Sequence, residues 1–134
     1  MSGFQFTFAG ETDALFPNGV RAERPSVDLH IEVVSNTDSN LLESSDLGRA
    51  DVEFQFGEII AGVIALDLDR ASALSTGDES RTWRTLVTHE LGHILGLGHT
   101  ENPEDPMFEG VLGETLSAGD RAGLGRLHAR SDGC

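Results

Sequence analysis

The sequence has one cysteine, no lysine and no tyrosine, and each shortage excludes a class of structure or site. The cysteine, Cys134, is the last residue, so neither an intramolecular disulfide nor a cysteine-ligated zinc site can form. All nine basic residues are arginine, against 23 acidic residues, and the formal net charge of −14 would repel a phosphate backbone. We therefore expect no nucleic-acid partner. The acidic surface suits divalent cations or cationic partners, and solubility alone is the competing explanation.

Long apolar runs are also missing. No stretch approaches the ~20 apolar residues that span a bilayer, so we expect no membrane partner. The N-terminal residues MSGFQFTFAG contain neither a basic region nor a long apolar region, and no signal peptide is visible. A length of 134 residues fits one compact domain, residues 1–134, which we expect to be monomeric.

Hydrophobic periodicity changes along the chain from the spacing of strands to that of helices. Alternating or continuous apolar segments predict four strands, at 4–8, 27–33, 51–56 and 59–69. Apolar residues at helical spacing predict a helix from about 83 to 95, and a capping box at 117–120 predicts another to about 129. Residues 9–26, 35–48 and 71–80 are expected to be loops. Strands followed by helices indicate an α+β domain.

The segment HELGHILGLGH, residues 89–99, contains three of the five histidines of the chain. His89 and His93 are four residues apart, so on a helix they share one face and can bind the same cation. Glu90 lies beside them, near enough to reach a metal-bound water. A continued helix would turn His99 away from this face. Gly96 can end the helix in a left-handed conformation, which would return His99 to the same ion.

Three neutral imidazoles leave one tetrahedral position for water, which is typical of a catalytic zinc site holding one Zn²⁺ ion. Zinc can lower the pKa of that water to about 7. Glu90 could then accept its proton, and the hydroxide could attack a carbonyl. A chance pattern is the competing interpretation, but the motif fixes five positions and three of them are the rare residue histidine.

This motif resembles the zinc-binding signature of the metzincin metallopeptidases. The segment Asp105-Pro106-Met107-Phe108, with Met107 eight residues after His99, resembles the Met-turn of the matrixin (matrix-metalloproteinase-like) branch. The resemblance implies zinc ligands at His89, His93 and His99, a general base at Glu90, the motif glycine at Gly96 and the Met-turn methionine at Met107. Without tyrosine, the chain cannot supply the tyrosine ligand of the astacin-like and serralysin-like branches.

Two strands extend the likeness. Residues 48–52 resemble a matrixin strand, and residues 62–65 resemble the strand that lines the matrixin cleft and pairs with extended substrate. The wall of the S1′ pocket is expected from residues 108–115. The resemblance therefore implies a substrate cleft formed by Ile64, Ala65, Leu66 and Phe108.

The resemblance implies a metzincin-like α+β fold. Its twisted, mostly parallel sheet would have an antiparallel edge strand, an active-site helix and a C-terminal helix. An upper part, residues 1–95, would hold the sheet and the active-site helix, and a lower part, 96–134, the Met-turn. The implied function is that of a zinc-dependent endopeptidase acting on a peptide or protein. The alternative is a zinc-binding interaction module with little or no turnover. Family resemblance implies a secreted, extracellular protein, with a cytoplasmic location as the alternative.

The chain also departs from the matrixin pattern. Residues 9–26 show no amphipathic helix, and the strands at 51–56 and 59–69 are too close for the usual calcium and structural-zinc loops. His30 and His128 are isolated, so a surface or hydrogen-bonded role is favoured over a ligand role. A calcium ion is conceivable at four acidic residues because carboxylates suit it, although a solvated acidic loop is favoured: Asp67, Asp69, Asp78 and Glu79.

Overall fold

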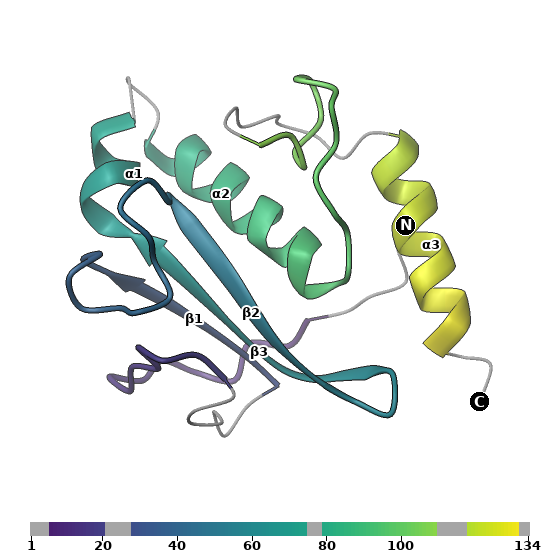
Figure 1. The fold of residues 1–134 in the computed structure, drawn as a ribbon, viewed down its shortest axis with the longest axis horizontal. Coiled ribbons are helices and arrows are strands. Elements are labelled where there is room, and N and C mark those ends of the chain that lie inside the picture. The colour runs from purple at the N-terminus through teal and green to yellow at the C-terminus, as the bar shows by residue number, and fades with distance from the viewer. Residues whose placement is uncertain (1–5, 21–27, 75–78, 110–117, 132–134) are drawn as a thin grey trace.

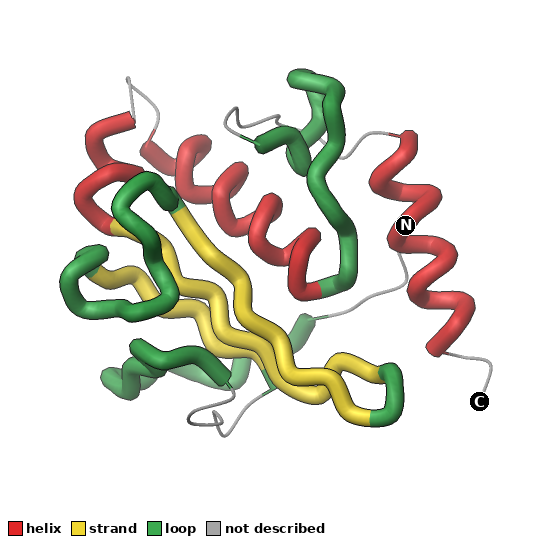
Figure 2. The backbone as a smooth tube through the Cα atoms, in the orientation of Figure 1, coloured by secondary structure: helices red, strands yellow, loops and turns green. Residues whose placement is uncertain are grey.

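The computed structural model describes residues 6–20, 28–74, 79–109 and 118–131, which form three strands and three helices (Figures 1 and 2). In chain order the elements are β1 (Leu29–Val34), β2 (Gly48–Gln55), β3 (Glu58–Asp67), α1 (Leu68–Leu74), α2 (Glu79–Ile94) and α3 (Ala118–Ser131). Among these described helices, none has the length and apolar character needed to cross a membrane.

The three strands form one mixed sheet in the order β1-β3-β2. The central strand β3 is parallel to β1, with Ile31 opposite Ile64, and antiparallel to β2, with Ala50 opposite the same residue. The described sheet therefore has one parallel and one antiparallel pair, where the sequence predicted a mostly parallel sheet. The expected antiparallel edge strand is present, and it is β2.

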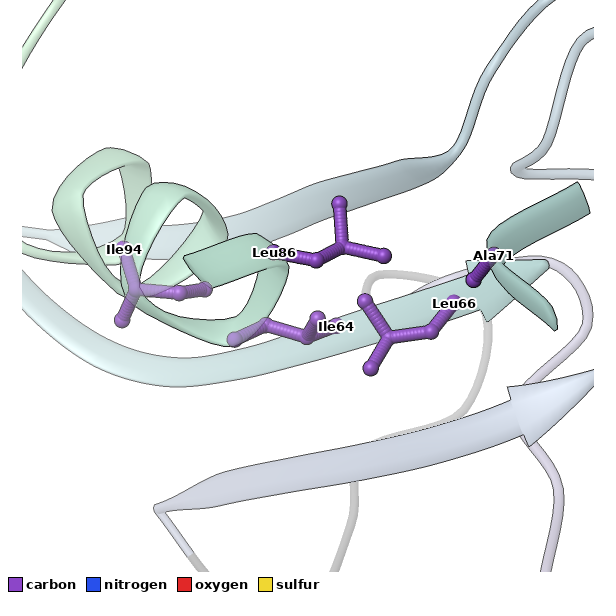
Figure 3. Packing of buried hydrophobic residues seen from close by; sticks show 5 residues of the cluster. All are labelled: Ile64, Leu66, Ala71, Leu86 and Ile94. Atoms are coloured by element: carbon purple, nitrogen blue, oxygen red, sulfur yellow. The ribbon is translucent and has the colours of Figure 1, made fainter. Parts of the chain in front are cut away.

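Helix α2 covers one face of the sheet above β2 and β3. Figure 3 shows Ile64 and Leu66 of β3 packed against Leu86 and Ile94 of α2, with Ala71 of α1 at the end of the cluster. All five side chains are buried. Their alternation on β3 and their helical spacing on α2 place the helix at a fixed position across the strands, which determines where its polar face lies.

The opposite face of the sheet is covered by the segment around residues 16–20 and the loop after β1. Phe16 and Val20 pack there against Ala61 and Val63 of β3. Backbone groups of this segment are held by carboxylates of the two outer strands. Glu32 accepts a hydrogen bond from the Phe16 N–H at 2.8 Å, and Asp51 accepts one from the Val20 N–H at 2.9 Å.

Strand β1 is present where the sequence predicted it, but the face that it buries carries two polar side chains beside Val34. His30 and Glu32 are buried, whereas Ile31 and Val33 are 43% and 49% exposed. The register explains this arrangement. His30 lies opposite Val63, on the face that Phe16 covers, whereas Ile31 lies on the face of α2, which packs over β2 and β3 instead. Of the two roles expected for His30, on the surface or hydrogen-bonded, the surface role is therefore wrong.

Two predicted elements differ from the structure. Residues 6–8 form no strand, and residues 4 and 5 of that predicted strand lie outside the described residues. Residues 68–74 form α1 where a loop was expected from residue 71. Asp67 explains the start of this helix, because its carboxylate accepts the Arg70 N–H at 3.0 Å, as an N-cap residue does.

Candidate metal centre

The last two turns of α2 place His89 and His93 side by side. Their Nε2 atoms are 3.1 Å apart, and the Nε2 atom of His99 is also 3.1 Å from that of His93. One nitrogen from each of the three residues lies within 4.8 Å of the others. Three histidines separated by up to ten positions in the sequence thus meet at a single point.

A Schellman motif returns the chain so that His99 can reach this point. Gly96, where the sequence places the end of the helix, has a φ angle of 93°. The Leu97 N–H donates to the Gly92 carbonyl and the Gly96 N–H donates to the His93 carbonyl, both at 2.9 Å. This left-handed position favours glycine, which explains one glycine of the HELGHILGLGH segment.

Backbone carbonyls orient the two helical imidazoles. His89 Nδ1 lies against the Pro106 carbonyl oxygen, and His93 Nδ1 is 2.9 Å from the Leu97 carbonyl oxygen. A carbonyl only accepts, so each Nδ1 must carry the proton and each Nε2 must present a lone pair. Burial lowers the pKa of both imidazoles, and the carbonyl contacts oppose this. His99 lowers the pKa of both rings further, and His93 also lowers that of His89. Both rings are therefore neutral around pH 7.

Converging lone pairs repel one another unless a cation lies between them. Two of the three nitrogens here have no proton to share, and both distances from His93 Nε2 are close to the spacing of about 3.3 Å that tetrahedral Zn–N bonds of 2.0–2.1 Å require. Imidazole nitrogen is a preferred ligand of zinc. The donor set therefore fits a Zn²⁺ ion with three protein ligands.

Glu90 points toward β2 rather than into solvent. It is buried, its carboxylate accepts a hydrogen bond from the Ala50 N–H, and a Cβ at Gly48 would lie 2.8 Å from Glu90 Oε1. Burial, and after it the charge of Asp46, raise the pKa of this carboxyl to about 7 against the opposing effects of Arg49 and the Ala50 bond. The group can therefore gain or lose a proton near neutral pH.

Met107 packs directly beneath α2. Its side chain is fully buried, and a Cβ at Gly92 would overlap its Sδ atom. The loop that carries it is closed by a hydrogen bond of 2.9 Å from the Thr100 N–H to the Met107 carbonyl and by a bridge between Thr100 and Phe108. Met107 was expected as the Met-turn methionine, whereas no role was expected for Gly92, whose missing side chain makes this close approach feasible.

The expected cleft residues are not brought together. Ile64, Ala65 and Leu66 lie in the central strand, are almost fully buried, and have a paired strand on either side. Their backbone cannot pair with a substrate, so that prediction was wrong. The sequence could not rank 59–69 as edge or centre, because strand order depends on the pairing of β1. Phe108 is half-buried in the loop after His99, and its place in a pocket wall stays a prediction.

Among the described residues, one set of three or more histidine, cysteine or acidic side chains lies close enough together to share a metal ion. That set is the histidine triad. Asp67 caps α1, and Asp69 is exposed in the first turn of that helix. Asp78 and the Glu79 side chain lie outside the described part of the chain. The calcium site stays a prediction without support from these positions.

Comparison with known proteins adds to this geometry. The family model of Matrixin matches residues 16–129 of the chain. Mouse matrix metalloproteinase-25 is 28% identical over 116 residues, which cover 81% of this chain. The matched region is 19% of that relative, so the chain spans about a fifth of its length. No solved structure matches the chain.

Proposed function

The chain belongs to the matrixin family, and on this premise we propose that it is a zinc-dependent endopeptidase. The observation that carries the proposal is the convergence of three Nε2 atoms beside a buried glutamate. The family implies the metzincin fold, zinc and peptidase chemistry. The small mixed sheet, α2 and the loop through Met107 are compatible with that fold.

In this proposal His89, His93 and His99 hold zinc, which when bound supplies a Lewis acid that polarises the peptide carbonyl and acidifies water. Glu90 accepts a proton from the attacking water and passes it to the leaving amine. A pKa raised by burial suits this exchange near neutral pH. Pro106 and Leu97 act through their carbonyls, which keep two imidazoles in the tautomer that presents Nε2.

We place the substrate along β2 instead of β3. Among the described residues β2 has one edge paired with β3 and the other open. The Ala50 N–H donates to Glu90, so at this residue the backbone donor faces the catalytic side chain and not β3. An extended peptide that added to this edge would lie beside Glu90, held by backbone hydrogen bonds. Phe108 is proposed for the pocket wall beyond it.

The alternative, a zinc-binding interaction module, needs the histidines but not the glutamate. The test is Glu90→Ala in zinc-loaded protein, incubated with a peptide pool with and without a chelator and analysed by mass spectrometry. The matched control is Glu101→Ala, which changes an exposed glutamate outside the site. We expect Glu90→Ala to retain zinc and lose cleavage by at least about 100-fold, as the loss of a general base does. Equal cleavage by Glu90→Ala and wild type would refute the proposed role.

The partners and setting follow from the same proposal. We propose a protein or peptide substrate, a monomeric enzyme and, by family membership, an extracellular location. Size-exclusion chromatography with light scattering would test the monomer.

A further inference from the structure

The hairpin between β2 and β3 ends in three exposed apolar side chains, which we call the apolar tip: Phe54, Phe56 and Ile59. They are 54%, 99% and 37% exposed. Figure 1 shows the hairpin extending past the C-terminal end of α2. One exposed apolar residue is ordinary, but three at one turn of a chain with net charge −14 are not.

The turn itself does not favour its residue. Phe56 and Gly57 connect the strands with φ angles of 53° and 88°, the pattern of a type I′ turn. The first position of this turn favours asparagine, aspartate or glycine, because a larger side chain is strained at positive φ. Phe56 adopts this strained conformation although its side chain is 99% exposed, so no packing within the fold offsets the strain. An outlier of this kind points to a contact outside the fold.

Strand β2 connects the apolar tip with the metal centre. Ala50 bonds Glu90, and Phe54 follows four residues along the same strand, a distance of about 14 Å. Consider a peptide bound along the open edge of β2. Its residue about five or six positions from the scissile bond would therefore lie at the tip. This step rests on the proposed function.

The charges around the tip indicate which peptide it would accept. Glu53 precedes Phe54 and the exposed Glu58 follows Gly57, within a chain of strong negative charge. This surface attracts basic residues and repels acidic ones, including an anionic lipid surface. We propose that the apolar tip is an exosite that binds an apolar side chain flanked by arginine or lysine, distant from the scissile bond of the substrate.

The test compares Phe56→Asn, which keeps a residue suited to the turn, with Leu68→Asn. Leu68 is 47% exposed and follows the opposite end of β3, so it is a matched loss of exposed apolar surface away from the tip. Zinc-loaded proteins are incubated with synthetic peptides of about 16 residues, long enough to pass the tip, and with versions shortened to the cleft. We expect Phe56→Asn to raise KM about tenfold for long apolar-basic peptides only, with kcat unchanged. Equal KM values for wild type and Phe56→Asn on the long peptides would overturn the exosite.

A binding measurement separates this inference from the peptidase proposal. The same peptides are bound to zinc-loaded Glu90→Ala protein with and without Phe56→Asn, and the retained peptides are identified. Loss of the apolar-basic peptides in the double variant would support the exosite even if wild type cleaved nothing. Equal retention by both proteins, or Phe56-dependent binding to phosphatidylcholine vesicles in place of peptides, would overturn it.

Discussion

Histidine is buried beside glutamate in two regions of this molecule, on α2 and on β1, and the two regions differ in what the nitrogen atoms face. At the end of α2, three Nε2 atoms converge on one point, and those of His89 and His93 present lone pairs there. On β1, His30 Nε2 is buried without a hydrogen-bond partner, 3.6 Å from Glu32 Oε2, and no third donor joins them among the described residues. Burial alone therefore does not identify a metal site, whereas converging unprotonated nitrogens do.

The surrounding backbone makes the difference. Carbonyls of Pro106 and Leu97 fix the tautomers at the metal centre. In the β1 region the carboxylate of Glu32 instead holds the Phe16 N–H, and Phe16 packs edge-on against the His30 ring. The first arrangement presents ligands to an ion, and the second attaches a loop to the sheet.

Replacing one histidine in each region by alanine should give the largest difference between the two regions. We expect His99→Ala to weaken zinc binding on the order of 1,000-fold, because structural zinc sites gain about 10–16 kcal/mol from four ligands. His30→Ala should leave zinc affinity unchanged and lower the thermal midpoint, since it removes buried packing beneath Phe16. Competition with a chromophoric chelator measures the first quantity, and unchanged affinity in His99→Ala would mean that the chain does not return to the metal.

The pH dependence of stability tests Glu90 in the metal-free protein. Its pKa is raised to about 7 in the fold, above its ordinary value of 4.5, so folding favours the protonated form. Stability from this group is thus fully present below about pH 4.5 and declines as pH rises through 7, by up to about 3 kcal/mol.

We therefore expect metal-free Glu90→Gln to be more stable than wild type at pH 8, by up to about 3 kcal/mol, and no more stable at pH 4.5. Urea denaturation with a chelator measures both differences, and Glu104→Gln, at an exposed position, is the control. A gain of the same size at both pH values would show that titration of Glu90 is not the cause.

The smallest expected effect concerns the support beneath the metal centre. Gly92→Ala would force Met107 away from α2, and overpacking of this kind costs about 1–3 kcal/mol. Gly98→Ala is the matched control, because a Cβ there meets nothing within 4 Å and the backbone is not left-handed. The free energies of unfolding of the two variants, measured by denaturation, should differ by at least about 1 kcal/mol. Equal stability would show that the absence of a side chain at Gly92 is not needed beneath the metal centre.

Hydrophobic periodicity predicted the places of β1, β2, β3 and α2, and the capping box predicted α3, although in β1 the alternation did not show which face is buried. The spacing of His89, His93 and His99, with Gly96 between, likewise indicated the site without coordinates. A local sequence pattern was enough to predict the site because its ligands and its glutamate lie within eleven consecutive residues.

What the sequence could not provide depends on contacts between distant segments. The burial of His30 follows from Phe16 docking on the far face of the sheet. The central place of β3 follows from β1 pairing with it across some thirty residues. Pro106 and Leu97 act through backbone carbonyls, so their side-chain types give no indication of this role. Gly92 was not singled out because the pattern explained only Gly96, the glycine that ends the helix.

The central claim is that three imidazoles of this chain share one zinc ion and leave a position open. X-ray absorption spectroscopy at the zinc edge, on protein loaded with one equivalent of zinc, tests it directly. We expect three nitrogen ligands at about 2.0–2.1 Å and one further light atom, with one nitrogen fewer in His99→Ala. A spectrum with sulfur ligands, or one unchanged by His99→Ala, would contradict the claim.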